Sequence, residues 1–448
     1  MVEFLLQRFA SHADDEAIVW NDTSYSYGWL LSRINEWRSS IAQSEITPGA
    51  VVAIEADFSP NSVALFLALT EHRCILVPLS GSVEFKKPEF REIAEVEVSV
   101  RIDPSDQMNV HRNTIASHPY YQSLRELRHP GLVLFSSGST GKSKAAVHDL
   151  TKLLEKFKVL RHQRRSVSFL LFDHIGGVNT MLYSLSNGGC LITLTDRNPD
   201  AVLRAVDKHR ADLLPTSPTF INLVLLSEAY KRHDLKTLQT VTYGTEPMPE
   251  STLKRFHELF PHIALQQTYG LSEVGILRSK SKSSDSLWVK LGGEGFSMRV
   301  VDGTLQIKAQ SAMLGYLNAP SPFTQDGWFN TGDSVEVDGE YLKILGRRSE
   351  IINVGGEKVY PAEVESVIHQ MPGVAEVTVY SEKNPITGNI VCAKVRLMPE
   401  VDIDPKTFAN KLKMHCRQRM QAFKVPVKVA LQADEQYSAR FKKMRIDA

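Results

Sequence analysis

The sequence predicts an α/β protein with a large N-terminal domain of stacked mixed α/β subdomains and a small C-terminal α+β domain. The first observation is length, since 448 residues are too many for one typical hydrophobic core. The second is an alternation of strand-like and helix-like segments over 14–130 and again over 167–210. Such alternation is typical of mostly parallel sheets covered by helices. The third is a change of pattern near residue 346, after which helix, two strands and helix follow.

Composition and charge exclude several classes of protein. Lys and Arg number 52 and Asp and Glu 51, so no broad nucleic-acid or membrane surface is expected. No apolar run approaches the roughly 18–20 residues that span a bilayer, and the N-terminus lacks a signal-peptide pattern. The cysteines are far apart and form no metal pattern, so we expect reduced structural thiols in a cytoplasmic protein: Cys74, Cys190, Cys392 and Cys416.

The first subdomain is predicted from four segments in sequence. Ser24 to Tyr27 leads into a helical pattern that continues to about Ile41. Strand 51–54, helix 62–69 and strand 74–78 follow. Strand, helix and strand in this order indicate a parallel sheet with helices on its faces.

An apolar run at 132–135 predicts a buried strand, and a polar loop follows it directly. Glycine lets backbone N–H groups approach an anion, hydroxyls donate hydrogen bonds and lysine adds positive charge. The loop fails the Walker pattern and continues into an extended segment instead of a helix. A flexible surface loop is the alternative. The expected phosphate-binding loop is Ser136-Ser137-Gly138-Ser139-Thr140-Gly141-Lys142-Ser143-Lys144.

A second subdomain is predicted after a helix at 150–160. Its elements are strand 167–172, turn 173–177, helix 180–185, strand 190–194 and helix 201–210. Two later strands end at Gly244-Thr245-Glu246-Pro247 and at 267–273. Because ligands bind at the C-terminal ends of strands in α/β sheets, both segments are candidate ligand-binding loops.

The small domain is predicted to start after a β-hairpin. Asp338-Gly339 is a turn signal between strands 334–337 and 341–345, and Gly346-Arg347-Arg348-Ser349 comes next. We expect residues 1–346 and 347–448 to form the two domains. Pro361 opens an amphipathic helix, and strands 374–380 and 390–397 and a helix at 408–420 complete the small domain. The tail at 440–445 is basic.

Four motifs in this order resemble those of the adenylate-forming superfamily: acyl-CoA synthetases, carrier-protein adenylation domains and luciferases. The loop at 136–144 fits the family's Ser/Gly/Thr/Lys phosphate pattern. Tyr269-Gly270-Leu271-Ser272-Glu273 resembles YGxTE, and 327–333 resembles GWxxTGD. Gly346-Arg347 with 352–365 resembles the hinge and the glycine-rich segment. The resemblance covers nearly the whole chain and implies a mobile small domain with a hinge near Ser349.

The resemblance implies an ATP site. The loop at 136–144 would close over the β- and γ-phosphates, and 244–247 would line the adenine ring, with Tyr269 stacked on it. Ser272 and Glu273, next to Gly270, would hold the α-phosphate region and Mg²⁺, for which a carboxylate is a suitable ligand.

Two further residues complete this implied site. Asp333 would accept hydrogen bonds from the ribose hydroxyls, and Arg347 would bind the ribose or a phosphate. The structural alternatives are a turn residue for Asp333 and a neighbour of a helix N-terminus for Glu273.

The resemblance also implies a catalytic lysine near the C-terminus. Lys442 stands three residues before Arg445, which keeps the family's Lys-x-x-Arg spacing, while Phe441 replaces the usual glycine. Lys442 is the predicted catalytic lysine, with Lys443 as rival and a solvated basic tail as the alternative. Ser349 departs from the family's usual Asp or Lys, and Gln267 departs from its usual Asn.

The implied reaction has two halves. A carboxylate attacks the α-phosphate of ATP, giving an acyl-adenylate and pyrophosphate, and a thiol then displaces AMP. Rotation of the small domain about Ser349 would carry Lys442 away and bring Gly355-Gly356 to the site. Glycines there would leave a narrow channel for a pantetheine arm.

The resemblance places the acyl pocket near His174, Gly176 and Gly177, together with Thr268, and a structural histidine is the alternative for His174. The glycines would leave space for a ring or chain, and no Asp clearly presents itself to an amino group. We therefore expect a fatty or aromatic carboxylic acid, with ATP, Mg²⁺ and CoA as co-substrates and cofactors. Loading of an acyl- or peptidyl-carrier protein is the second interpretation, and a non-catalytic nucleotide-binding protein is the third.

Overall fold

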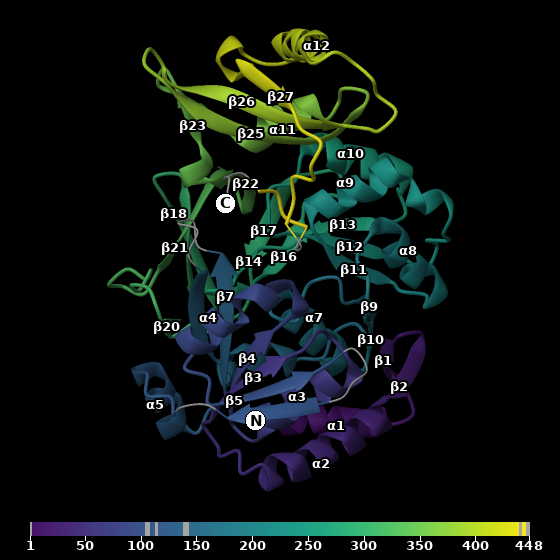
Figure 1. The fold of residues 1–448 in the computed structure, drawn as a ribbon, viewed down its shortest axis with the longest axis vertical. Helices are drawn as coiled ribbons and strands as arrows, with labels where there is room; N and C mark the ends of the chain where they lie inside the picture. Colours follow the sequence, from purple (N-terminus) through teal and green to yellow (C-terminus); the bar gives the residue numbers. More distant parts are fainter. Residues whose placement is uncertain (1, 104–107, 113–114, 138–142, 439–440, 445–448) are drawn as a thin grey trace.

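The computed structural model describes residues 2–103, 108–112, 115–137, 143–438 and 441–444. Two sheets of seven strands form the centre of the large domain, and a smaller domain lies beyond them (Figure 1). The predicted fold class, with a large domain of stacked α/β subdomains and a small C-terminal domain, is confirmed. No described helix is long and apolar enough to cross a membrane.

The first sheet carries the predicted phosphate-binding loop. Its order is β20-β8-β7-β4-β3-β5-β6, with β3, β4, β5 and β7 parallel and β8 antiparallel to β7. The strands are β3 (Val51–Glu55), β4 (Ile75–Leu79), β5 (Val98–Ile102), β6 (Met108–Arg112), β7 (Gly131–Ser137), β8 (Ser143–Asp149) and β20 (Gly315–Tyr316). Its central strands are buried on both faces, as expected for a helix-covered parallel sheet.

The second sheet has the order β13-β12-β11-β9-β10-β1-β2. All neighbours except β1 and β2 pair in parallel. The strands are β1 (Glu16–Trp20), β2 (Thr23–Ser26), β9 (Arg165–Val167), β10 (Cys190–Ile192), β11 (Leu213–Thr216), β12 (Thr240–Tyr243) and β13 (Ala264–Gln267). The predicted strand 167–172 is wrong in its bounds, because the strand of this region, β9, covers 165–167.

The helices cover these sheets and start at recognisable caps. Ser59 and Ser62 form a capping box at the start of α3, and Ser217 caps α9, each satisfying first-turn amides. The helix expected at 150–160 is short, because α6 ends at Leu154 and a 3₁₀ turn follows. The helices of this domain are α1 (Glu3–Ser11), α2 (Tyr27–Gln43), α3 (Pro60–Glu71), α4 (Lys87–Ile93), α5 (Pro119–Leu127), α6 (Leu150–Leu154), α7 (Ile175–Ser186), α8 (Pro199–Lys208), α9 (Pro218–Ser227) and α10 (Glu250–Leu259).

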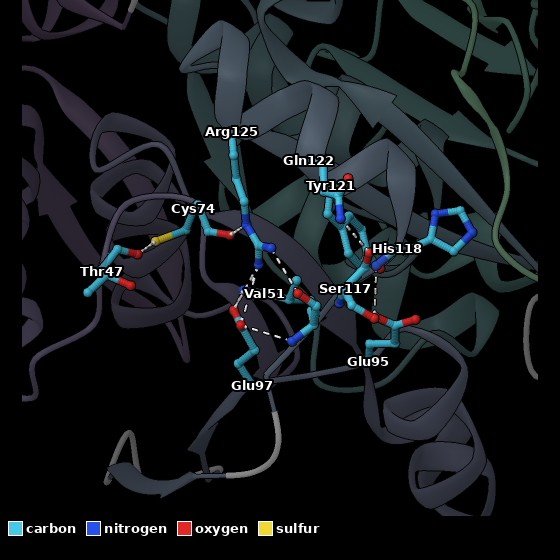
Figure 2. A network of polar contacts seen from close by, with 12 residues as sticks. Thr47, Val51, Cys74, Glu95, Glu97, Ser117, His118, Tyr121, Gln122 and Arg125 are labelled. Atoms are coloured by element: carbon cyan, nitrogen blue, oxygen red, sulfur yellow. Dashed lines mark hydrogen bonds and ion pairs between the residues drawn. The ribbon is translucent and has the colours of Figure 1, made fainter.

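A half-buried carboxylate, that of Glu97, ties helix α5 to the first sheet (Figure 2). Glu97 accepts hydrogen bonds from the Val51 amide at 2.6 Å and from the Ala116 amide at 3.0 Å. Arg125 of α5 lies 3.4 Å from the same carboxylate and donates to the Gly49 carbonyl at 3.0 Å. These bonds lie at the N-terminal ends of the strands, so they support the sheet at the end opposite to the predicted ligand loops.

A third sheet, antiparallel throughout, completes the large domain. Its order is β16-β17-β22-β21-β19-β18, and the predicted hairpin at 334–345 is its centre. The strands are β16 (Arg278–Ser281), β17 (Trp288–Gly292), β18 (Phe296–Val301), β19 (Thr304–Ala309), β21 (Phe329–Asp338) and β22 (Tyr341–Arg347). The antiparallel pair β14 (Gly270–Leu271) and β15 (Gly275–Ile276) directly precedes this sheet in the sequence and forms a separate two-stranded sheet.

The small domain packs two helices against its own sheet. Its core includes residues of α11, α12, β25 and β26. The elements are β23 (Ile352–Val354), β24 (Glu357–Val359), α11 (Pro361–Ile368), β25 (Val374–Asn384), β26 (Gly388–Leu397), α12 (Pro405–Arg417) and β27 (Lys428–Leu431). Figure 1 shows the yellow C-terminal tail leaving β27 and running to the large domain beside β12 and β13.

Candidate active site

The predicted phosphate-binding loop joins two antiparallel strands. Ser136 in β7 pairs with Lys144 in β8, and Ser137 pairs with Ser143. Strand β8 continues to Asp149, which confirms that an extended segment, not a helix, follows the loop. The loop's middle lies outside the described residues: Gly138, Ser139, Thr140, Gly141 and Lys142.

Two side chains near β20 hold the return strand of this hairpin. The Asn318 amide oxygen accepts from the Ala145 amide at 3.0 Å, and its nitrogen donates to the Ser143 carbonyl at 2.9 Å. The Lys144 ammonium lies 5.3 Å from the centre of the Tyr316 ring, a cation–π distance. Neither Asn318 nor Tyr316 was predicted, because their segment shows no periodicity and carries none of the motifs.

Glu273 lies at the centre of the candidate site. Its carboxylate accepts a hydrogen bond from the Tyr316 hydroxyl at 2.6 Å, so one side chain links it to Lys144. Burial, and then the charge of Glu273, raise the pKa of Tyr316, which keeps the phenol a donor. Glu273 lies between β14 and β15, where no described helix begins, so the alternative of a helix-terminus neighbour is wrong.

The Glu273 carboxylate has the chemistry of a magnesium ligand. One donor occupies one of its oxygens, and a carboxylate offers further acceptor positions. Mg²⁺ is commonly held by one or two carboxylates together with substrate phosphates. Glu273 with half-buried Ser272 beside it therefore fits a metal–phosphate site.

Asp333 is fixed by two neighbours. Its carboxylate accepts from the Tyr269 hydroxyl and lies 3.1 Å from the Arg347 guanidinium, which faces it across β21 and β22. Burial, and then the Asp333 charge, raise the pKa of Tyr269. Asp333 lies inside strand β21, so the turn alternative is wrong. Tyr269 is 7% exposed, and its hydroxyl holds the Asp333 carboxylate in place; its stacking on adenine stays a prediction.

The segment after β12 is strained and closely packed. A Cβ at Gly244 would lie 2.7 Å from the Thr268 hydroxyl and 2.8 Å from its carbonyl oxygen, so only glycine fits there. Thr245 has a φ of +74°, which is rare for a β-branched residue. Thr268 donates to the Tyr243 carbonyl at 3.1 Å and so closes the strand end. Strain of this kind clusters at ligand sites.

Glu246, predicted to line the adenine ring, binds two protein amides through its carboxylate. One carboxylate oxygen accepts from the Thr219 amide at 2.8 Å. The other accepts from the Lys443 amide at 3.0 Å. The segment 244–247 therefore connects to the C-terminal tail through its glutamate, while Pro247 follows half-buried.

The two glycines of the expected acyl pocket serve packing. His174 caps helix α7, its imidazole accepting from the Gly176 amide at 3.0 Å, so 175–177 are helical and not a turn. A Cβ at Gly177 would lie 1.9 Å from the Leu171 carbonyl oxygen, and one at Gly176 would lie 2.6 Å from Leu170. The prediction that these glycines leave space for an acyl group is corrected, because the protein itself fills that space.

The adjacent lysines of the tail have different environments. Lys443 lies 2.9 Å from the Glu365 carboxylate, with 14% and 1% of the two side chains exposed. Lys442 is exposed, and among the described residues no ion pair involves it. Its neighbour Phe441 has a φ of +51°, the conformation that glycine would adopt most easily. Lys443 is thus held by a buried carboxylate, whereas the Lys442 side chain is exposed.

Gly355 and Gly356 form the turn of the β23–β24 hairpin. Their φ values are +59° and +94°, and nothing described lies within 4 Å of a Cβ built on either. Both are exposed, as is Ser349 in the short 3₁₀ turn after β22. Gly270 is closely packed, unlike these two glycines. A Cβ there would lie 2.3 Å from the Ile276 side chain, the residue that Gly270 pairs with between β14 and β15, so this pairing requires a glycine.

These features define a large α/β domain and a small domain, with the candidate site at the strand ends where the C-terminal tail contacts the large domain. The family description "AMP-binding enzyme" matches residues 82–308, half of the chain, and "AMP-binding enzyme C-terminal domain" matches 363–440. The chain belongs to the AMP-binding enzyme family.

Relatives and solved structures agree with this assignment. The chain is 26% identical over 436 residues to an indoleacetate–CoA ligase of Aromatoleum aromaticum, covering 85% of this chain and 84% of that protein. It is 26% identical over 469 residues to a feruloyl-CoA synthase of Amycolatopsis, covering 94% and 92%. An anthranilate CoA ligase crystallised with anthranoyl-AMP shares the fold, with a TM-score of 0.82, 20% identity and coverage of 99% and 95%.

Proposed function

We propose that this protein is an ATP-dependent acid–thiol ligase. It activates a carboxylic acid as an acyl-adenylate, releases pyrophosphate and transfers the acyl group to the thiol of CoA. One observation carries the proposal. The C-terminal hairpin that carries Lys442 (436–438 and 441–444, here called the Lys442 hairpin) contacts the large domain at the ends of β11 and β12, through Ser217 and Glu246. The small domain thus brings a lysine to the strand ends where ligands bind in α/β sheets. This suits an enzyme that forms the acyl-adenylate in one domain arrangement and transfers the acyl group to a thiol in another.

The first half-reaction depends on charge stabilisation and positioning. Glu273 would hold Mg²⁺, which when bound neutralises phosphate charge. Asp333 would accept from the ribose hydroxyls, and Arg347 beside it would bind ribose or phosphate. Lys442 would stabilise negative charge developing at the α-phosphate, and the loop at 136–144 would hold the departing pyrophosphate. The acid would bind near His174 and Thr268, on the side of the sheet where these strands end.

The second half-reaction requires a different arrangement of the domains. Strand β22 ends at Arg347, one residue past the proposed boundary after residue 346, and the proposed hinge at Ser349 lies in the short 3₁₀ turn that follows. Rotation there would withdraw Lys442 and bring Gly355-Gly356 to the site. Both glycines are free of nearby side chains, which supports their proposed role beside a pantetheine arm.

The proposed acids are aromatic or fatty. The relatives named above act, by their names, on indoleacetate and ferulate, and other relatives are named for medium- and long-chain fatty acids. Pyrophosphate exchange with a panel of indoleacetate, ferulate, anthranilate, octanoate and palmitate tests the first half-reaction. Adding CoA, or a carrier protein bearing phosphopantetheine, tests the acceptor.

The proposal expects acid-dependent exchange with at least one of these acids and a thioester with CoA. A thioester formed only on a carrier protein would overturn the choice of acceptor. ATP binding without exchange for any acid would overturn the proposal and favour a non-catalytic nucleotide-binding protein.

A further inference from the structure

The C-terminal tail forms a tight hairpin around the proposed catalytic lysine. The Met444 amide donates to the Gln436 carbonyl at 3.0 Å, and the Ser438 amide donates to the Lys442 carbonyl at 2.9 Å. Tyr437 and Lys443 pair as an antiparallel bridge. The described part of this hairpin, 436–438 and 441–444, therefore holds its shape through its own backbone.

Both peptide groups next to Lys442 are held by side chains of the large domain. The Ser217 hydroxyl donates to the Phe441 carbonyl at 2.7 Å. The Lys443 amide donates to the Glu246 carboxylate at 3.0 Å. One bond thus lies before Lys442 and one after it, so its backbone is fixed on both sides while its side chain stays exposed.

The two docking side chains are themselves anchored to the start of helix α9. Ser217 is fully buried and accepts from the Phe220 amide at 3.2 Å. The second oxygen of Glu246 accepts from the Thr219 amide at 2.8 Å. Neither side chain can turn away without losing a hydrogen bond of the first helical turn, which makes the docking point rigid.

Apolar packing supports the same arrangement. The Phe441 ring lies 5.3 Å from the Phe169 ring and 5.6 Å from the Phe220 ring, both of the large domain. By contrast, the ion pair of Lys443 with Glu365 joins two residues of the small domain. Domain rotation would break the contacts of Ser217 and Glu246 but keep the Lys443–Glu365 pair.

We propose that Ser217 and Glu246 are positioning residues that dock the Lys442 hairpin for adenylation and release it for thioester formation. This inference rests on the proposed function. Because the two bonds exist only in the docked arrangement, losing either should slow adenylation and spare the transfer of a preformed acyl-adenylate. A hydrogen bond of this kind corresponds to about a 5- to 20-fold change in rate.

Separate assays of the two half-reactions test the inference. Ser217→Ala removes the donor to Phe441, whereas Ser217→Thr keeps both a hydroxyl donor and a helix cap. Glu246→Gln cannot accept from Thr219 and Lys443 at once. We expect Ser217→Ala and Glu246→Gln to lose about 10-fold in adenylation, with CoA transfer from supplied acyl-adenylate within twofold of wild type, and Ser217→Thr to keep both rates.

A control separates docking from general damage. Glu365→Gln weakens a bond inside the small domain, so it should change both half-reactions by the same factor. The docking inference is overturned if Ser217→Ala and Glu246→Gln also lower both half-reactions equally, or if they leave adenylation unchanged.

Hydrogen exchange tests docking without any activity. In full-length ATP-free enzyme, the amides of 436–444 should exchange faster in Ser217→Ala and Glu246→Gln than in wild type, and at the wild-type rate in Ser217→Thr. If the tail amides exchange at the wild-type rate in both Ser217→Ala and Glu246→Gln, the inference is overturned even if the enzyme is active. An inactive wild type with faster exchange in the variants would instead overturn the proposed function and leave the docking contact established.

Discussion

The hydroxyl of Tyr316 donates to the carboxylate of Glu273 at 2.6 Å, and the same ring lies 5.3 Å from the Lys144 ammonium. One aromatic side chain thus connects the proposed metal ligand to the end of the phosphate-binding loop. Because β20, which ends at Tyr316, pairs with β8, the backbone fixes this connection. A change at Tyr316 is therefore expected to affect both Mg²⁺ binding at Glu273 and phosphate binding at the loop.

Tyr316→Phe should weaken Mg²⁺ use. The hydroxyl orients the Glu273 carboxylate, and a hydrogen bond to a charged group contributes about 1.5–3 kcal/mol. We expect the Mg²⁺ concentration for half-maximal pyrophosphate exchange to rise about 10-fold. Titration of Mg²⁺ at saturating ATP measures this.

Tyr341→Phe is the matched control, because Tyr341 begins β22 at the far end of the hairpin and its ring faces Lys282. Its Mg²⁺ dependence should equal that of wild type. An unchanged Mg²⁺ dependence in Tyr316→Phe would show that the hydroxyl does not orient a metal ligand.

Lys442→Ala and Lys443→Ala should fail in different ways. Lys442→Ala should lose adenylation by about 100-fold or more, the usual cost of a charge-stabilising donor, and should still convert supplied acyl-adenylate to thioester. Lys443→Ala removes the ammonium that faces the Glu365 carboxylate, 1% exposed, so it should lose about 3–5 kcal/mol of stability. Half-reaction assays and urea unfolding distinguish the two. If Lys443→Ala alone showed the selective adenylation loss, Lys443 would be the catalytic lysine.

The order of loops and strands was predictable because the motifs lie directly at strand ends. Ser136 and Lys144 lie one residue inside the end of β7 and the start of β8, and Asp333 lies on a strand beside Arg347. Strands β16, β17, β18 and β19 were not predicted, although the sequence of β18, FSMRVV, alternates apolar and polar residues over its first five positions as strands do. No motif marks these strands, and β18 has no buried residue.

Side-chain roles were less predictable than positions. Gly177 is a glycine because the Leu171 carbonyl approaches it, and a contact of this kind has no sequence signal. Glu246 meets Lys443 across nearly two hundred positions, and only the docked tail brings them together. Tyr316 has no motif of its own, and its role depends on the pairing of β20 with β8.

Gly355→Leu should separate the two half-reactions in the opposite direction. Nothing described lies within 4 Å of a Cβ at this position, so leucine meets no clash in the present arrangement and adenylation should stay within about twofold. If the turn lines a pantetheine channel after rotation, the thioester rate should fall at least about 10-fold, since a side chain would obstruct a passage that glycine leaves open.

Backbone strain needs its own control, because φ at Gly355 is +59°. Gly355→Asn tolerates this conformation better than leucine and adds a smaller side chain, so its thioester rate should lie between those of wild type and Gly355→Leu. Equal loss of both half-reactions in Gly355→Leu would contradict the channel.

The free energy of unfolding should decrease as the pH is lowered, because His148 is buried in its neutral form. This residue lies fully buried in β8, and burial lowers its pKa to about 4. An unfolded histidine has a pKa near 6.5, so below that pH the unfolded chain binds a proton that the folded chain does not. The stability due to neutral His148 is complete above pH 6.5 and is lost progressively as pH falls from 6.5 towards 4, at up to about 1.4 kcal/mol per pH unit.

Urea unfolding of wild type and His148→Gln at pH 7.5 and 5.5 measures this loss. Gln does not titrate, so between these two values the variant should lose about 1.4 kcal/mol less than wild type, whatever its stability at pH 7.5. Other histidines and the carboxylates contribute equally to both proteins and cancel in the comparison. Parallel losses in the two proteins would mean that His148 takes up its proton in the folded state as readily as in the unfolded one, contrary to its burial.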